Sequence, residues 1–295
     1  MTHNARPDRL IQVTVLAHNE EARIDACLAS LPVGEEGVHV TVVVNGSTDL
    51  TAARVRAHEG VELVEYEQGG KARSWNRFVL EAGRKADTFV FVDGDAQLVP
   101  GTVAALSDAL TGNPHANAAS GLPMNGRRAK AYRRSIAAER GLFGDCYALA
   151  GDFVRRMRES GIRLPDDIVG EDGLVRALAS TDLGPESEWS SARVIPVEAA
   201  GFWCEPNALD AKGLRQQAAR MTNYSLRHFQ NRIVSDIMRG PGPKALPREL
   251  AALYPQYLPR FRPRLSPLWF AFDRTALARM RARVETPAAS PSPRT

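Results

Sequence analysis

The feature that most constrains the fold is a regular alternation in the first third of the chain. Segments with helical spacing separate four apolar runs, at 11–16, 38–44, 61–66 and 88–92. These runs are nearly continuous in apolar character, which is typical of strands covered on both faces and therefore of parallel pairing. The order β-α-β-α-β-α-β predicts an α/β protein with a doubly wound, mostly parallel sheet flanked by helices.

The helices are expected between and after these strands. A polar loop is expected from about 111 to 128, and many prolines between 239 and 267 predict an irregular segment. The predicted helices lie at 20–31, 47–58, 75–85, 102–110 and from about 129 to 142.

Composition narrows the class of protein. The chain has 295 residues, 44% of them hydrophobic, which suits a globular protein with a substantial core. The three cysteines show no CxxC spacing, so a reduced, cytoplasmic setting is expected, without a zinc site or a disulfide framework. The N-terminus does not resemble a signal peptide, and no apolar run approaches the roughly 20 residues of a spanning helix.

Charge is concentrated near the C-terminus. The net charge is +4, but residues 211–284 contain two lysines and thirteen arginines against three acids. A segment this basic indicates either an anionic partner, such as phosphate groups or a membrane surface, or a solvated arginine-rich face. We therefore expect a protein that is cytoplasmic or peripherally attached to a membrane through this region.

These patterns predict a domain organisation. We expect a flexible N-terminus at 1–9 and a disordered tail at 285–295. The main domain at 10–235 would comprise two halves, at 10–100 and 101–235. A basic, Pro-rich C-terminal extension, helical or irregular, would follow at 236–284.

Two carboxylates follow the fourth strand in the sequence FVFVDGDAQL. Because parallel strands end at the same edge of the sheet, Asp93 and Asp95 should lie near the residues that follow the first two strands. Carboxylates at i and i+2 can bind one hard divalent cation that also takes substrate phosphates. An Asp-Gly turn without a ligand is the alternative.

Other phosphate-binding motifs are excluded. Gly69-Gly70-Lys71 lacks the earlier glycine and the following Ser or Thr of a Walker loop, and a GxGxxG dinucleotide fingerprint is absent. Lys71 remains able to meet a phosphate as a point charge.

Several motifs occur in a fixed order between about residues 12 and 221. They are VTVLAHNEEARIDACLASL, VVVNGSTDLT, GGKARSWN, FVFVDGDAQLVP, GIRLPDDIVGEDGLVRAL and AAGFWCEPNALDAKGLRQQAARM. The first four resemble the nucleotide-binding half of family 2 glycosyltransferases, which have the GT-A fold. The match continues with an acidic pair at Glu171-Asp172 and a segment that is similar to the one leading to the family's QxxRW motif. The resemblance implies that 10–100 is a nucleotide-binding half and 101–235 an acceptor half.

The resemblance implies roles for individual residues. It implies nucleotide contacts from Ala17, Asn19, Glu20, Asn45, Lys71, Asn76 and Asp93. It implies that Asp95, with Asp93, holds Mn²⁺ or Mg²⁺, and that Asp172 is the general base with Glu171 beside it. Gln217 and Arg220 would meet the diphosphate or the acceptor.

The chain departs from the family's pattern at two places. Val44-Asn45 stands where many members have an acidic pair before GSTD, which bears on the identity of the nucleotide. Met221 replaces the aromatic residue of QxxRW, which argues against stacking of an acceptor sugar there and against a processive polymerase.

The expected function is transfer of a sugar, with inversion, from a nucleotide diphosphate sugar, foremost a UDP-sugar, to an acceptor hydroxyl. The acceptor is a lipid-linked glycan, a peptide or a small molecule, and nucleic acid is not expected as a partner. Two alternatives remain: a sugar-phosphate nucleotidyltransferase, and a non-catalytic protein that binds anionic ligands or nucleic acid through the basic C-terminal third.

Overall fold

The structure is a computed structural model that describes residues 9–126, 128–204 and 211–285. The expected N-terminal segment and C-terminal tail lie almost entirely outside the described residues. Within them, the strands are β1 (Ile11–Ala17), β2 (Val38–Asn45), β3 (Val61–Tyr66), β4 (Thr88–Asp93), β5 (Ala96–Leu98), β6 (Ala118–Pro123), β7 (Cys146–Ala150) and β8 (Val194–Cys204).

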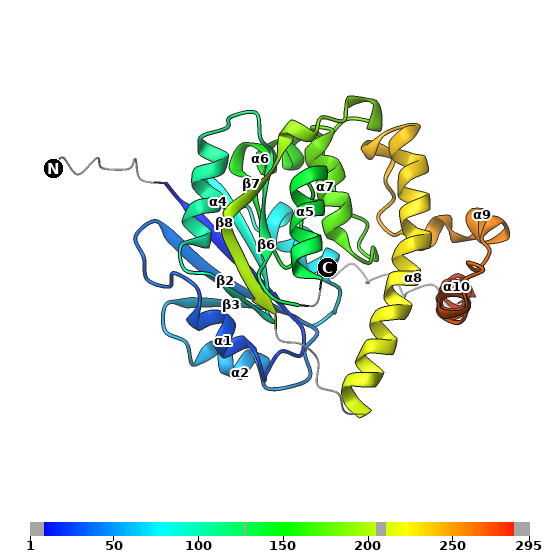
Figure 1. Ribbon diagram of the computed structural model, residues 1–295, viewed down its shortest axis with the longest axis horizontal. Helices are drawn as coiled ribbons and strands as arrows, with labels where there is room; N and C mark the ends of the chain where they lie inside the picture. Colours follow the sequence, from blue (N-terminus) through cyan, green and yellow to red (C-terminus); the bar gives the residue numbers. More distant parts are fainter. Residues whose placement is uncertain (1–8, 127, 205–210, 286–295) are drawn as a thin grey trace, which may run out of the picture.

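Helices occupy most of the remaining described chain (Figure 1). The α-helices are α1 (Ile24–Ala29), α2 (Thr51–Arg56), α3 (Lys71–Asn76), α4 (Thr102–Thr111), α5 (Ala129–Glu139), α6 (Gly151–Ser160), α7 (Glu171–Ser180), α8 (Ala211–Arg239), α9 (Tyr254–Tyr257) and α10 (Pro267–Glu285). A π-helical turn, η1 (Arg77–Glu81), extends α3. The short 3-10 helices are η2 (Glu186–Glu188), η3 (Ser191–Arg193), η4 (Pro243–Ala245), η5 (Leu250–Leu253) and η6 (Leu258–Arg260).

One mixed sheet joins all the described strands in the order β3-β2-β1-β4-β7-β6-β8-β5. The first four are parallel, as the sequence predicts, with Val15 of β1 opposite Val42 of β2 and Val92 of β4. β7 then pairs antiparallel with β4. The carboxyl ends of β1, β2 and β4 and the start of β7 therefore share one edge of the sheet.

Helices cover both faces of the sheet, which explains the continuous apolar runs. Alternate residues of β4 enter different cores: Phe89 and Phe91 pack with α3, α6 and α7, whereas Val90 and Val92 pack with α1, α2 and α4. The doubly wound α/β architecture is thereby confirmed.

Some sequence predictions differ from the structure. Residues 20–23 form a turn before α1, because the backbone N–H groups of Arg23 and Ile24 both bond to Glu20 O. The predicted loop at 111–128 contains a buried strand, β6, whose sequence AASGLP lacks the large residues typical of strands. A side chain at Gly121 would lie 3.0 Å from Cys146 Sγ, so small residues are required where β6 approaches β7.

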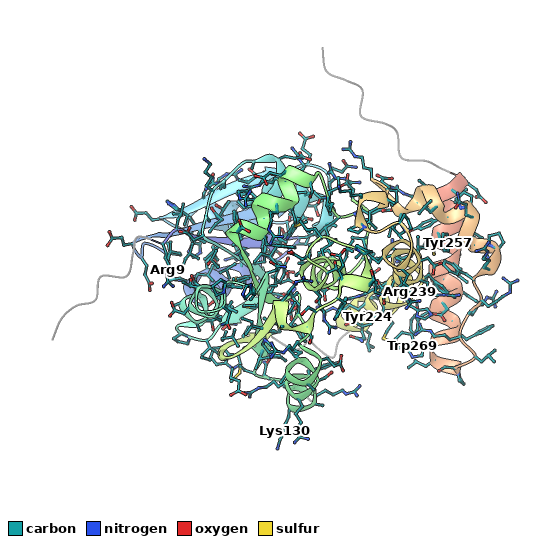
Figure 2. All side chains as sticks on the ribbon, turned by 90° about the horizontal axis from the view of Figure 1, so that it is seen from above. Arg9, Lys130, Tyr224, Arg239, Tyr257 and Trp269 are labelled. Carbon is teal, nitrogen blue, oxygen red and sulfur yellow. The ribbon has the colours of Figure 1, made fainter. Side chains whose placement is uncertain are left out.

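The C-terminal extension forms an outer layer (Figure 1). Helix α8 packs through Phe229 and Ile233, and α10 packs against α8 through Ala276, Leu277 and Met280. Figure 2 shows Tyr257 and Trp269 on this layer, away from Lys130 on α5. The proposed boundary at 235/236 stays a prediction, and α8 continues across it to Arg239.

Among the described helices, none combines the length and the apolar character that crossing a bilayer requires.

Candidate active site

The loops after β1 and β2 are connected by side-chain hydrogen bonds. Asn19 has a φ of 57°, and its Oδ1 accepts a bond from the backbone N of Thr48 at 2.9 Å. Its own backbone N donates to Ser47 Oγ at 3.0 Å, and Glu20 N donates to Thr51 Oγ1 at 2.8 Å. The two motifs therefore form one connected surface, on which the Asn19 side chain is exposed and supports the neighbouring loop.

Asn45 is buried and its amide has protein partners on both sides. Its Nδ2 donates to Ala17 O at 2.9 Å, and its Oδ1 accepts from Gly70 N at 3.2 Å. His18 Nδ1 lies 2.7 Å from Asn45 O. In this structure the Asn45 side chain joins the end of β1 to the start of α3, and the nucleotide contact expected of it stays a prediction.

Asn76 is likewise placed behind the edge of the sheet. Its Nδ2 donates to Leu164 O at 2.8 Å and to Asp166 Oδ1 at 2.9 Å, and its Oδ1 accepts from Leu164 N at 3.1 Å. The side chain is fully buried. Its amide anchors the segment that leads to α7, and the nucleotide contact expected of Asn76 stays a prediction.

Gly94, between the two aspartates, allows a close approach of β1. A side chain at Gly94 would lie 3.0 Å from Ala17 Cβ and 3.2 Å from Glu20 Cγ. Ala17 is correspondingly buried beneath this turn. The Asp-Gly-Asp sequence thus brings Asp93 and Asp95 beside Glu20.

Lys71 joins the end of β4 to the start of α7. Its Nζ lies 2.6 Å from Asp93 Oδ1 and 2.8 Å from Glu171 Oε1. Burial disfavours the charged amine, but the two carboxylates outweigh it and hold the pKa of Lys71 well above its ordinary value. Lys71 and Glu171, which are far apart in sequence, are therefore in direct contact in the site.

Asp95 lies among cations from two elements. Arg23 contacts Glu20 Oε2 at 2.5 Å and Asp95 Oδ2 at 3.3 Å, and Arg220 of α8 lies 3.9 Å from Asp95 Oδ2. Burial, with the Asp95 charge next, raises the pKa of Glu20. Arg23 was not among the expected site residues, because in sequence it resembles an ordinary solvated residue at a helix start.

Asp145 is a further acid at this edge that sequence analysis missed. Its carbonyl oxygen accepts a bond from Asp93 N at 3.1 Å, and its Oδ2 accepts from Cys204 Sγ at 3.3 Å. Burial raises its pKa, and the charges of Asp95 and Asp172 add to that effect. The residue could be located only by knowing that β7 runs antiparallel to β4, which places its start beside Asp93.

Asp172 occupies the first turn of α7 and contacts Arg227 of α8. Arg227 Nη2 lies 3.1 Å from Asp172 Oδ2. A side chain at Gly170 would lie 2.5 Å from the Arg227 guanidinium, and one at Gly173 would lie 3.0 Å from it. The glycines flanking Glu171-Asp172 therefore make room for Arg227. Glu171 itself is buried against Lys71.

Gln217 and Arg220 lie one turn apart on α8, and both are exposed. Arg220 approaches Asp95, as described above, which brings the QxxR segment to the same edge of the sheet as the Asp-Gly-Asp turn. We call the set Glu20, Asp93, Asp95, Asp145, Glu171 and Asp172 the acidic edge.

The acidic edge offers carboxylates to a divalent cation without enclosing it. Among the described residues, no group of three or more His, Cys, Asp and Glu side chains is arranged to bind a metal by itself. Burial, together with the charges of Asp145, Glu171 and Asp95, raises the pKa of Asp93 well above its ordinary range, although Lys71 opposes the shift. Crowded carboxylates of this kind fit a cation held by one or two protein ligands, with phosphate and water completing its coordination.

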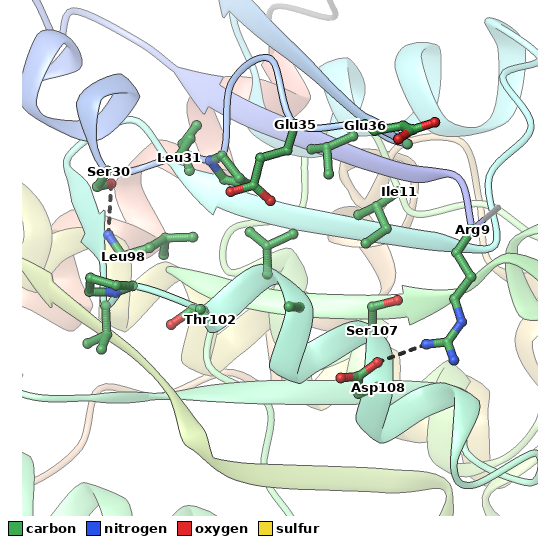
Figure 3. A pocket seen from close by; sticks show the side chains of 18 of the residues that line it. Arg9, Ile11, Ser30, Leu31, Glu35, Glu36, Leu98, Thr102, Ser107 and Asp108 are labelled. Atoms are coloured by element: carbon green, nitrogen blue, oxygen red, sulfur yellow. Dashed lines mark hydrogen bonds and ion pairs between the residues drawn. The ribbon is translucent and has the colours of Figure 1, made fainter. Parts of the chain in front are cut away.

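A cavity of about 1020 Å³ lies away from the acidic edge. Figure 3 shows Ile11, Leu31 and Leu98 among its lining residues and the Arg9–Asp108 ion pair at one end. None of the acidic-edge residues lines it. The cavity therefore contains none of the carboxylates that could bind a metal or accept a proton, and the candidate site lies at the acidic edge.

Comparison with known families distinguishes a glycosyltransferase from the alternatives of a nucleotidyltransferase and a non-catalytic binding protein. The sequence model of glycosyl transferase family 2 matches residues 12–178, more than half of the chain. The chain belongs to glycosyl transferase family 2. The family match includes the acidic edge from Glu20 to Asp172, and no curated protein matches the sequence.

Solved structures with the GT-A fold are similar to this glycosyltransferase. A mannosyltransferase from Pyrobaculum calidifontis, in complex with GDP-Man and Mn²⁺, has a TM-score of 0.58 at 17% identity over 94% of this chain and 87% of its own. Glucosyl-3-phosphoglycerate synthase from Mycobacterium tuberculosis, in complex with Mn²⁺, UDP and glucosyl-3-phosphoglycerate, has a TM-score of 0.51 at 23% identity over 74% and 80%. These likenesses confirm the fold.

Proposed function

We propose that this family member is a metal-assisted, inverting glycosyltransferase that uses a nucleotide diphosphate sugar, foremost a UDP-sugar. The observation that carries the proposal is the Lys71 bridge, which joins the Asp-Gly-Asp turn to the Glu171-Asp172 pair through contacts of 2.6 and 2.8 Å. Through this bridge, a group suited to binding a diphosphate and a group suited to accepting a proton belong to one site.

The donor end of the site would be formed by the β1, β2 and β4 loops. Asp95, with Asp93, would hold Mn²⁺ or Mg²⁺, and when bound the cation supplies positive charge to the departing diphosphate. Arg220 and Gln217 are exposed beside this place and would contact the diphosphate or the acceptor. Arg is well suited to paired hydrogen bonds with phosphate oxygens.

The acceptor end would be served by Asp172. Its carboxylate would take the proton of the acceptor hydroxyl while that oxygen bonds to the anomeric carbon and the bond to the nucleoside diphosphate breaks. A single displacement of this kind inverts the anomeric centre. Arg227 would act as a positioning residue for Asp172, and Glu171 would position Lys71.

The identity of the donor nucleotide is the least constrained part of the proposal. The similar structures contain GDP-Man in one case and UDP in the other. Asn45 is occupied by protein partners in this structure, so base selection would depend on backbone groups and on the exposed Asn19. The acceptor would be a lipid-linked glycan, a peptide or a small molecule; the mycobacterial neighbour contains a glucosylated phosphoglycerate.

The first experiment measures the melting temperature with UDP, GDP, CDP or ADP, each with Mn²⁺ and again with EDTA. A ligand at 100 times its Kd stabilises the folded protein by about 2.7 kcal/mol. A shift with one nucleotide that requires the metal would support the donor assignment. Absence of a shift with every nucleotide would contradict it.

Two substitutions separate the assigned roles. Asp95→Asn should abolish the metal-dependent nucleotide shift, whereas Asp172→Asn should retain it and lose transfer by two to four orders of magnitude, about the size of a general-base contribution. Asp152→Asn, at an exposed acid of α6, is the matched control and should change neither property. Normal turnover by Asp172→Asn would remove Asp172 as the base.

A further inference from the structure

The start of α10 exposes a cluster of large apolar side chains. Leu265 is 96% exposed, Leu268 60% and Phe270 42%, all within six residues. Leu268 and Phe270 are two positions apart on α10 and project from different sides of it, so the exposed apolar side chains surround the start of the helix. Apolar residues exposed singly are common, whereas three at one helix start indicate an interaction site. We call Leu265, Leu268 and Phe270 the apolar tip.

The apolar tip is held in a defined position. Arg264 donates to Asp273 Oδ1 at 2.6 Å and to Ser225 Oγ of α8 at 3.2 Å, and its guanidinium lies 4.1 Å from the Trp269 ring centroid. Figure 2 shows Trp269 and Tyr224 of α8 on the same side of the outer layer. The exposure of the tip is therefore a property of the packed α8–α10 pair.

The surroundings of the apolar tip are basic. Residues 258–284 contain seven arginines and one acid, Asp273. That acid is fully buried and paired with Arg264, so it does not offset the exposed cations. The exposed arginines of this segment are Arg260, Arg262, Arg274, Arg279 and Arg281.

The two faces of α10 differ in chemistry. The face that packs against α8 carries Asp273, Ala276, Leu277 and Met280. The exposed residues Leu268, Ala271, Thr275, Ala278 and Ala282 recur at helical spacing and carry no charge. Arg274, Arg279 and Arg281 flank this uncharged stripe, so the exposed side of α10 combines cations with one leucine, three alanines and a threonine.

We propose that the apolar tip and the outer face of α10 dock this protein on an anionic lipid surface. Leucine and phenylalanine side chains would enter the boundary between headgroups and acyl chains, and the flanking arginines would contact lipid phosphates. Charge complementarity selects this partner. In a dimer formed through this surface, the arginines of the two copies would repel one another. A nucleic-acid backbone would bind the arginines but would leave the leucines exposed to water.

The docking is independent of the transferase chemistry, but one consequence rests on the proposed function. If the site transfers sugar, a membrane-docked enzyme would meet acceptors carried by lipids, which favours that acceptor class over a freely diffusing one.

The test is sedimentation of the full chain with vesicles of phosphatidylcholine alone or mixed with phosphatidylglycerol. We expect binding that requires the anionic lipid and weakens as NaCl is raised. Replacement of the tip by serine, Leu265→Ser with Leu268→Ser and Phe270→Ser, should lower the partition coefficient at least about tenfold. Trp189→Ser, at a 42% exposed tryptophan outside the donor loops, is the control and should bind like the wild type.

A second variant keeps the proposal testable if the serine variant folds poorly. Arg274→Gln with Arg281→Gln should reduce binding to anionic vesicles about fivefold for each arginine removed. Lys130→Gln with Arg134→Gln, on exposed positions of α5, is the matched control. Nucleotide-dependent melting should be unchanged in all these variants, so that loss of docking and failure of the transferase proposal are distinguished.

Three outcomes would overturn the proposal. The first is that the protein does not bind anionic vesicles, and the second is that the wild type and the tip variant bind them equally. The third is that substitution of the tip changes only self-association of the protein in the absence of lipid.

Discussion

At the scale of single residues, Lys71 is the cation that neutralises two carboxylates of the acidic edge. Its amine is the partner of Glu171, whose side chain is only 4% exposed, and of Asp93. Removing one member of a buried ion pair leaves an uncompensated charge, which costs far more than an exposed pair contributes.

We therefore predict that Lys71→Met lowers the free energy of unfolding by about 3 kcal/mol. Chemical denaturation measures this, with Lys85→Met, at an exposed lysine, as the control expected to change it by less than about 0.5 kcal/mol. Adding Glu171→Gln to Lys71→Met should recover part of the loss, because the unpaired charge is then removed. Equal effects of the two lysine substitutions would show that the bridge does not form.

The sequence identifies the acids of the motifs but not the residues that support them. The structure brings Asp93, Asp95 and Asp172 to one edge, and the roles expected of them stay predictions. Arg23 and Asp145 have no sequence signal, because the position of Arg23 depends on the turn at Glu20 and that of Asp145 on an antiparallel strand. The partners of Asn76 could not be predicted, because sequence does not reveal which way a helical side chain points.

At the scale of elements, the start of α7 determines where Asp172 lies. Gly170 precedes the helix with a φ of 76° and leaves room for Arg227 of α8. A larger residue at this position would destabilise the protein in two ways, because the left-handed backbone disfavours a side chain and because the side chain would collide with the guanidinium of Arg227.

Gly170→Ala should therefore destabilise the protein more than Gly161→Ala. Gly161 has a φ of 68°, and the methyl carbon that alanine adds there would have no atom within 4 Å, so its substitution costs about 1–2 kcal/mol for the backbone alone. The additional loss of stability in Gly170→Ala measures the cost of displacing Arg227. Transfer activity should fall in Gly170→Ala and not in Gly161→Ala. Equal destabilisation at the two glycines would show that Arg227 moves aside at no cost.

Element prediction was accurate where the pattern was strongly apolar. β1, β2, β3 and β4 match their predicted runs closely, and α4 matches within a residue. β6 was missed because tertiary packing against β7 selects small residues there over strand-forming ones. The segment predicted as one helix at 75–85 begins earlier, at Lys71, and continues as a π-helical turn.

At the scale of the whole molecule, Asp273 connects the loop before α10 to α8 through Arg264. Burial raises the pKa of this carboxyl, but hydrogen bonds from the Arg264 side chain and backbone outweigh burial and bring the pKa to about 2. The folded-state pKa is below the unfolded value of about 3.9, so the carboxylate stabilises the folded protein above that pH. The contribution is lost as the pH falls toward 2.

Asp273→Asn should accordingly lower the free energy of unfolding by about 2 kcal/mol at neutral pH, and by roughly half as much near pH 3. Urea denaturation at both pH values measures the difference, with Glu59→Gln, at an exposed acid near α2, as the control. A loss that does not shrink on acidification would assign the effect to packing and not to the ion pair.

The segment of α8 from Arg220 to Arg227 contacts both the acidic edge and the outer layer. Arg220 and Arg227 approach Asp95 and Asp172, while Ser225 between them accepts a bond from Arg264 beside the apolar tip. Ser225 and Arg227 are separated by only about 3 Å of helix rise, so one short segment of α8 joins the tip to Asp172. If the tip rests on lipid, this segment acts as a fixed spacer that sets the height of Asp172 above the surface and therefore the reach that an acceptor needs.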